Sequence, residues 1–262
     1  MKGYKGFKKG MVYRGKQYAE NTTFEEQGNK SATNKSHIGA KLSIASFIKA
    51  LVDFTFSKID FKNAKSTNTG DRSAATNTGN WSVAKNTGYR SATTNTGDYS
   101  ATTNTGCRSA ATNTGNWSVA KNTGYRSAAT NTGNCSTAAN TGNCSAATNT
   151  DDYSAATNTG NCSAATNTGD YSAAANTGNC SAATNTGNWS VAEVSGNDSF
   201  AICTGINGKA KGKLGCYIAL AEYGVDKGHY HLRFFKTHKV DNETIKADTW
   251  YTLKNGEFCV AE

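Results

Sequence analysis

Cysteine is the residue type in this chain best suited to metal binding or nucleophilic chemistry, and the sequence holds eight of them. Cys144, Cys162 and Cys180 recur every 18 residues, which is not the Cys-x-x-Cys spacing of a zinc site. We interpret this cysteine column as free thiols. The alternatives are cross-linking on oxidation and metal binding.

Histidine offers the second possible ligand set. His229 and His231 lie two residues apart with His238 close by, but no carboxylate pattern accompanies them, so we interpret them as surface side chains. The sequence also has no nucleophile elbow, no phosphate-binding loop and no paired carboxylates in an apolar setting. We therefore predict a protein that is not an enzyme and that needs no metal or cofactor.

Composition limits the kind of core that the chain can build. Of 262 residues only 36% are hydrophobic and 18% charged, and 27 are glycine, so a thick aliphatic core along the whole chain is excluded. The sequence contains no run of 18 apolar residues and no apolar signal segment, so we expect neither a membrane span nor secretion. The expected location is the cytoplasm, with association with a virion as the alternative.

Positive charge is concentrated near the start of the sequence. Residues 1–67 hold 13 Lys and Arg against 5 Asp and Glu, which is most of the net charge of +9. Basic and aromatic side chains alternate in the first sixteen residues, a pattern that predicts either a solvated strand pair or a contact with nucleic acid or another polyanion. The basic residues are Lys2, Lys5, Lys8, Lys9, Arg14 and Lys16.

A nine-residue repeat of the form NTGxxSAAT dominates the middle of the chain. It begins at Asn68 and runs through fourteen units to residue 193, with degenerate copies from Val194 and Cys203. The fifth position alternates between two residue sets from one unit to the next, so the structural period is 18 residues. We predict an all-β fold, a parallel β-solenoid or β-roll with two repeats per coil.

Strand periodicity assigns the repeat positions, numbered here from the Asn, to two faces. Positions six (Ser) and eight (Ala) should point inward and form a thin core, whereas positions five, seven and nine should point outward. Gly at position three is expected to supply a turn with positive φ. The Asn at position one is expected to form an amide ladder that bonds turn backbone.

Position five then generates two further outward columns. The aromatic column comprises Trp81, Tyr99, Trp117, Tyr153, Tyr171 and Trp189. The arginine column comprises Arg72, Arg90, Arg108 and Arg126. The aromatic column is either a ligand platform or a set of stacked rings that adds cohesion or packs in an oligomer. The arginine column could bind an anion, although the neighbouring sheet edge is otherwise neutral.

Both ends of the array need caps. Residues 40–54 have helical apolar periodicity and predict an N-terminal capping helix, followed by an extended segment over 54–61. Residues 214–223 predict the last coil, and a Lys254-Asn255-Gly256 turn predicts a hairpin. The expected organisation is a basic module over 1–39, cap and leading strand over 40–67, solenoid over 68–223 and a hairpin subdomain over 224–262.

Several segments carry a family resemblance. Residues 1–28, 38–54, the repeat array, 210–223 and 240–258 resemble a family of phage and prophage proteins along nearly the whole chain. The resemblance implies a phage context without a settled molecular activity. Those proteins carry a longer Cys- and aromatic-containing stretch with a GFHAC-like motif where this chain has only residues 28–38. Residues 199–212 also resemble head repeats of trimeric autotransporter adhesins.

Taken together, these features predict a non-catalytic β-solenoid scaffold, phage-borne, that binds an unidentified macromolecular partner through its repeated outer faces or associates with itself. One alternative is an adhesin or fibre-like component that binds glycans. Another is polyanion binding through the basic N-terminal residues. A further alternative is an ice-binding threonine array, because positions nine and two place threonines in outward columns.

Overall fold

The computed structural model describes residues 12–13, 16–17, 22–27, 33–38 and 66–261. The chain divides into two units, residues 1–43 and 44–261. In the first unit, β1 (Val12–Tyr13) pairs antiparallel with β2 (Lys16–Gln17), and β3 (Thr22–Gln27) pairs antiparallel with β4 (Thr33–Ile38). Of the six basic residues singled out near the start, only Lys16 lies in the described part of the chain.

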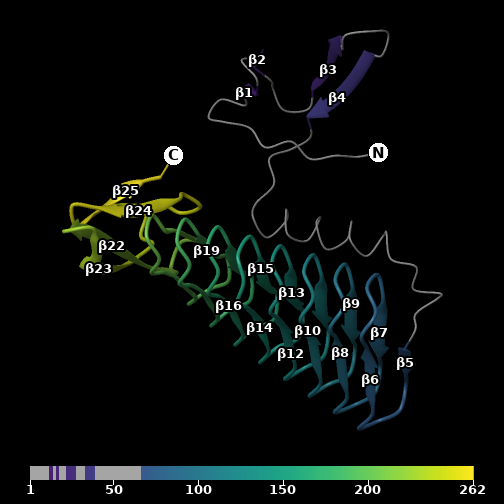
Figure 1. Ribbon diagram of the computed structural model, residues 1–262. Helices are drawn as coiled ribbons and strands as arrows, with labels where there is room; N and C mark the ends of the chain where they lie inside the picture. Colours follow the sequence, from purple (N-terminus) through teal and green to yellow (C-terminus); the bar gives the residue numbers. More distant parts are fainter. Residues whose placement is uncertain (1–11, 14–15, 18–21, 28–32, 39–65, 262) are drawn as a thin grey trace. The chain divides into compact units, whose positions relative to one another are not determined.

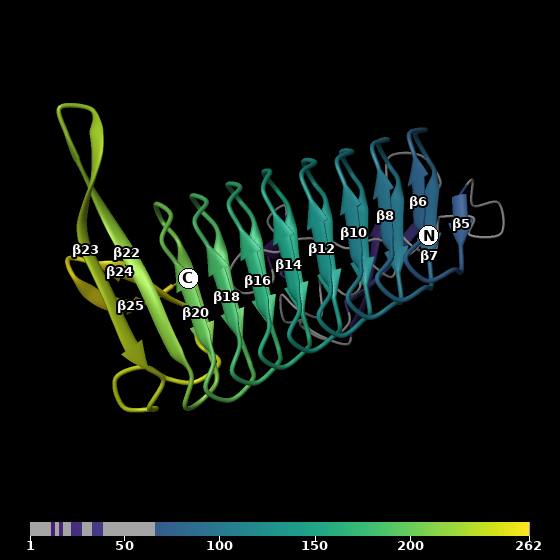
Figure 2. The same cartoon turned by 90° about the horizontal axis from the view of Figure 1, so that it is seen from below.

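The second unit is a stack of short strands that form two sheets (Figures 1 and 2). The even-strand sheet contains β6 (Ala74–Asn77), β8 (Ala92–Asn95), β10 (Ala110–Asn113), β12 (Ala128–Asn131), β14 (Ala146–Asn149), β16 (Ala164–Asn167), β18 (Ala182–Asn185), β20 (Phe200–Cys203), β22 (Tyr217–Asp226) and β23 (His229–Lys239). The odd-strand sheet contains β5 (Ser66–Asn68), β7 (Val83–Asn86), β9 (Ala101–Asn104), β11 (Val119–Asn122), β13 (Thr137–Asn140), β15 (Ala155–Asn158), β17 (Ala173–Asn176), β19 (Val191–Val194), β21 (Lys209–Gly212), β24 (Tyr251–Lys254) and β25 (Glu257–Val260).

Strand register confirms the 18-residue period. β10 pairs parallel with β12 so that Ala110 lies beside Ala128, and the same offset recurs from coil to coil in both sheets. Successive repeats therefore alternate between the sheets, and every second repeat lies directly above its predecessor. The predicted parallel β-solenoid with two repeats per coil is the fold of this unit.

The interior is as thin as the sequence predicts. Position-eight alanines such as Ala111 and Ala129 are fully buried. The position-six serines point inward and connect the coils, because the Ser109 N–H donates to Ser127 Oγ at 3.1 Å and the Ser127 hydroxyl approaches the Gly106 carbonyl at 3.2 Å. These hydroxyls occupy the space that a larger aliphatic side chain would fill in an ordinary core.

The position-one asparagines bond to the backbone of the turns. Asn122 Nδ2 donates to the carbonyls of Ser109 (2.8 Å) and Ala128 (3.1 Å). Asn122 Oδ1 accepts the N–H of Gly124 at 3.1 Å. The prediction that these amides satisfy turn backbone is confirmed, but their partners here are main-chain groups rather than one another, so the expected amide ladder is wrong in that detail.

The expected role of the repeat glycine is also wrong. Positive φ occurs at position five, where Arg108 (φ 56°), Trp117 (φ 54°) and Cys144 (φ 54°) all have left-handed backbone. Glycine is needed at position three because coils approach closely there. A Cβ on Gly124 would lie 2.5 Å from the Gly106 carbonyl carbon in the preceding coil.

Replacing Asp151, the one non-glycine residue at position three of the fourteen clear repeats, should stabilise the solenoid. Among the residues that the structure describes, the buried Asn149 Oδ1 has no hydrogen-bond partner, whereas Gly142 and Gly160 donate to the equivalent oxygens at 3.1 and 3.0 Å. We expect Asp151→Gly to restore this bond and raise the free energy of unfolding by about 1–2 kcal/mol, measured by chemical denaturation. The control is Asp152→Asn, which removes the same charge but keeps the acceptor for the Asp170 N–H. An equal gain in both variants would contradict the prediction.

The outer sides of the two sheets differ in exposure. Strand alternation places position seven outward in both. On the odd-strand sheet Val83 and Val119 are only 3% exposed and Ala101 is fully buried, whereas Ala74 and Ala92 on the even-strand sheet are exposed. Thr103 and Thr157, at position nine of the odd strands, also have buried hydroxyls without a hydrogen-bond partner in the described part of the chain. The even-strand sheet is therefore the more accessible repeated face.

Within the described residues, the largest fully buried apolar side chains lie toward the C-terminal end. Ile218, Leu220, Val240, Ile245 and Tyr251 are almost fully buried in one cluster, which closes the last coils. The predicted turn at Asn255-Gly256 is confirmed: both residues have positive φ (51° and 74°) and join β24 to β25.

Two predictions about the ends of the solenoid remain, the N-terminal cap and the C-terminal boundary. The predicted capping helix over 40–54 and the extended segment over 54–61 lie outside the described residues. The expected boundary between residues 223 and 224 falls inside β22, a strand that pairs with both β20 and β23. The β22–β23 hairpin therefore continues the even-strand sheet, whereas the β24–β25 hairpin continues the odd-strand sheet.

Candidate functional site

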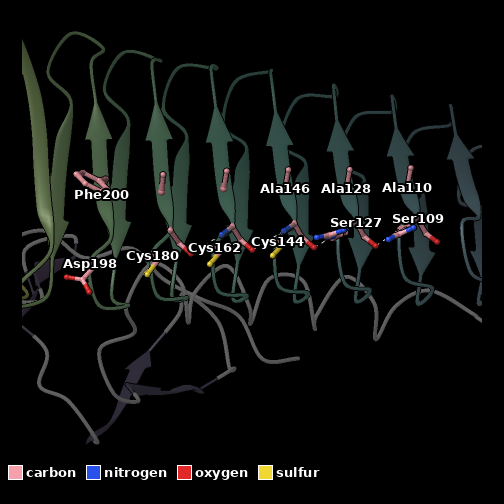
Figure 3. Close-up of a pocket in the computed structure, with 17 residues that line it drawn as sticks. Ser109, Ala110, Ser127, Ala128, Cys144, Ala146, Cys162, Cys180, Asp198 and Phe200 are labelled. Carbon is pink, nitrogen blue, oxygen red and sulfur yellow. Dashed lines mark hydrogen bonds between the residues drawn. The ribbon is translucent and has the colours of Figure 1, made fainter.

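A trough of about 740 Å³ runs along the outer side of the even-strand sheet. Alanines at position seven, such as Ala110, Ala128 and Ala146, lie on the sheet face where a larger residue would fill it (Figure 3). Side chains from position five rise from the preceding turns and line one side. In order along the coils, these are Arg108, Arg126, Cys144, Cys162, Cys180 and Asp198.

The left-handed backbone at position five sets this arrangement. Because every such residue has φ close to +54°, its side chain leaves the turn in the same direction in each coil, and equal positions form straight columns. The degenerate coils place Asp198 and Asn207 there, which are residue types that tolerate left-handed backbone. Arg, Trp and Cys adopt it at some cost in conformational energy, so these side chains are not explained by backbone preference.

The arginine column lies at one end of the trough and continues beyond it. Arg72, Arg90, Arg108 and Arg126 are all exposed, in successive coils of the even-strand side. Arg90 and Arg126 each lie 5.3 Å from the ring centroid of the preceding tyrosine, which orients their guanidinium groups. Like charges on neighbouring strands repel one another, so a bound anion would relieve an existing repulsion.

The cysteine column continues the same line. Cys144, Cys162 and Cys180 are exposed thiols whose sulfur atoms point to the same side in successive coils (Figure 3). The two buried cysteines differ: desolvation raises the pKa of Cys203 to about 12, and burial also raises the pKa of Cys216. Cys203 is therefore a protonated core side chain at neutral pH. The three thiols of the column are exposed to solvent, as is Cys107 in the turn before Arg108.

The serine side chains beside the trough belong to the hydrogen-bond network of the solenoid. The repeat serines nearest to the trough are buried and hydrogen-bonded to backbone, as Ser145 is to Gly124 at 3.2 Å. Within the described residues, no three His, Cys, Asp or Glu side chains lie close enough to hold a metal ion, and no helix is long and apolar enough to cross a membrane. No family model, curated protein or solved structure matches the chain.

The aromatic column lies on the opposite side, in the turns that lead into the odd strands. Trp81 and Tyr99 stack with ring centroids 4.5 Å apart, and Tyr171 and Trp189 stack at 5.2 Å, with interplanar angles of 4° and 8°. Cys135 interrupts the stack between Trp117 and Tyr153. Neighbouring rings cover each other's faces, so the column adds cohesion between coils and offers mainly ring edges to solvent.

Two features of the surface were not predicted from the sequence. At position four, Asn and Asp side chains accept the N–H of the residue 18 positions later, as Asp98 does from Asn116 at 2.8 Å. The frequency of Asn and Asp at that position was the available signal. The second feature is the length of the β22–β23 hairpin, for which the run of aromatic and basic residues after Gly228 was the signal. The histidines of this run lie in β23, where His229 and His231 are exposed.

Proposed function

We propose that this protein is a non-catalytic β-solenoid scaffold that binds an elongated anionic polymer along its even-strand face. The observation that carries the proposal is the arginine column: four exposed guanidinium groups in successive coils, next to an open trough with small alanine side chains. Neighbouring coils repeat at about 4.8 Å, so the column presents positive charge at regular intervals along the solenoid axis.

The geometry favours a chain-like partner over a small ligand. The trough is lined by residues from Arg108 to Phe200, which span six consecutive coils of the even-strand side. Its length suits an extended chain better than a compact small molecule. Guanidinium groups pair well with phosphate, sulfate and carboxylate. We also propose a phage or prophage origin, which is supported by the sequence resemblance alone.

Neutralising the arginine column should weaken polyanion binding. We expect the triple variant Arg90→Gln, Arg108→Gln, Arg126→Gln to bind a fluorescent single-stranded oligonucleotide or a heparin oligosaccharide at least about tenfold more weakly at low salt. For the oligonucleotide, the slope of log K against log salt should fall in magnitude by about 2, because roughly 0.7 counterions are released per charge. Fluorescence anisotropy over a salt series measures both quantities.

The control removes the same charge elsewhere. Lys213, Lys246 and Lys254 are exposed and lie outside the repeat array, so the triple Gln variant at these positions has the same net charge as the arginine variant. Equal weakening in the two variants would show that net charge alone drives binding, and binding unaffected by either would place the polyanion contact elsewhere, including the basic residues before β2. Either result would overturn the proposal.

A further inference from the structure

The β22–β23 hairpin extends well beyond the sheet that it terminates. β20 pairs only with Tyr217–Leu220 of β22, whereas the β22–β23 pairing continues to Asp226 and His229. Figure 2 shows these strands as a long arm at the end of the stack. The outer part of the arm is thus a two-stranded ribbon, an arrangement that is marginally stable in water without a further packing partner.

Apolar side chains on the arm are exposed to an unusual degree. Val225 is 60% exposed, Tyr230 59%, Leu232 55% and Phe235 52%. They follow one another along the hairpin instead of being scattered over the surface. A contiguous apolar surface of this kind marks an interaction site more often than a solvated loop.

One edge of the arm is also free for hydrogen bonding. β23 is the last strand of its sheet and pairs only with β22, so the backbone N–H and C=O groups along its other side have no strand partner in the described part of the chain. Eleven residues of extended strand give an edge of about 35 Å. Long exposed edges of this kind accept an additional strand.

The charge of β23 indicates which strand it would accept. Arg233, Lys236 and Lys239 lie in the strand, which holds no Asp or Glu. Lys236 pairs with Glu257 at 2.9 Å. The aliphatic part of the Arg233 side chain packs against Gly224 of β22, because a Cβ added to Gly224 would lie 2.9 Å from Arg233 Cγ. The Arg233 guanidinium lies 5.8 Å from the Phe234 ring centroid.

We propose that the free edge of β23 binds an extended acidic peptide segment of a partner protein by strand addition, with apolar residues alternating with Asp or Glu. Such a segment would pair with the open backbone edge, cover Tyr230, Leu232 and Phe235 with its apolar side chains, and place its carboxylates on the opposite face, beside Arg233. Lys239 adds positive charge at the end of the strand. A second copy of β23 is a poorer occupant, because antiparallel pairing of two such strands would bring cationic side chains together.

The test uses the full chain and an eleven-residue peptide of alternating valine and glutamate, labelled for fluorescence anisotropy. There are two control peptides. In the first, lysine replaces every glutamate; in the second, every second backbone nitrogen, along one edge of the strand, is methylated. We expect binding of the glutamate peptide alone, together with slower hydrogen exchange of the amides of residues 229–239 on binding. Arg233→Glu with Lys239→Glu should weaken binding at least about tenfold, whereas Arg233→Lys with Lys239→Arg should retain it.

Lys246→Glu with Lys254→Glu is the matched control, because both residues are exposed, lie outside β23 and undergo the same charge change. Circular dichroism should show that all variants keep the β-sheet spectrum. Any of three results would overturn the proposal: the N-methylated peptide binds as tightly as the glutamate peptide, the glutamate peptide does not bind, or hydrogen exchange slows outside residues 229–239 on binding. If the protein forms concentration-dependent dimers without peptide, and the amides of β23 exchange slowly in them, the occupant of the edge is a second copy of this chain and the acidic-peptide proposal is wrong. The arginine column plays no part in this test, so its outcome is independent of the polyanion proposal.

Discussion

Gly124→Ala is expected to lower the free energy of unfolding by about 3 kcal/mol or more, because the new methyl group would overlap backbone rather than a movable side chain. Its Cβ would lie 2.5 Å from the carbonyl carbon of Gly106 and 2.8 Å from Ser127 Oγ. Relief would require separation of two coils, and that would lengthen the interstrand hydrogen bonds around them. Denaturant titration followed by circular dichroism measures the loss.

Gly70→Ala is the matched control for that substitution. Gly70 occupies the same repeat position, but its nearest neighbour to an added Cβ is Asn68 Oδ1 at 3.5 Å, an ordinary van der Waals contact. Its φ is not in the left-handed region, so alanine is tolerated by the backbone. We expect a change within about 0.5 kcal/mol. Similar losses at both positions would mean that glycine is required for chain flexibility and not for close approach.

Asn122→Ala should destabilise the solenoid by about 2–4 kcal/mol, since it removes three buried hydrogen bonds at once. The Gly124 N–H and the carbonyls of Ser109 and Ala128 all lose their amide partner, and Asn122 itself is fully buried. Water would have to enter the narrow interior to replace those bonds. The expected signature is a lower denaturation midpoint with faster hydrogen exchange at the turns on either side.

Asn116 provides the comparison in the preceding repeat. It is exposed at position four, and its Oδ1 accepts one hydrogen bond, from the Asn134 N–H at 3.0 Å. Water can replace that acceptor after Asn116→Ala, so the expected loss is about 1 kcal/mol or less. A loss at Asn116 as large as the loss at Asn122 would contradict the assignment of the position-one amides as the main polar stabilisers of the turns.

The coil architecture could be predicted from the sequence because periodicity alone determines it. The alternation of Arg or Cys with aromatic residues at position five fixed 18 residues per coil, and the small inward residues Ser and Ala fixed a thin interior, both as the structure shows. The turn conformation could not be predicted in the same way. Glycine can be required for two different reasons, a positive φ or the close approach of another backbone. The fold assigns close approach to Gly124 and positive φ to Arg126, and the repeat sequence does not distinguish the two.

The surfaces were predicted less completely. The sequence places the arginine and aromatic columns on separate lines, and the structure shows them so, but residue type does not reveal that Ala110 and Ala128 line an open trough. The arm of β22 and β23 depends on where pairing with β20 ends, which is a tertiary property. The sequence predicts a hairpin in this region, but it does not show that an apolar side chain such as Leu232 is 55% exposed there.

The alternation of repeats between two sheets constrains how the gene for this chain can change in length. Gain or loss of 18 residues adds or removes one whole coil and leaves every later side chain on its original face, so Arg126 and Cys144 would stay in one line. Gain or loss of nine residues would transfer all later repeats to the opposite sheet, break both columns and direct the strand at Tyr217 to the wrong sheet. Recombination between repeats is therefore tolerated in even steps and disruptive in odd ones.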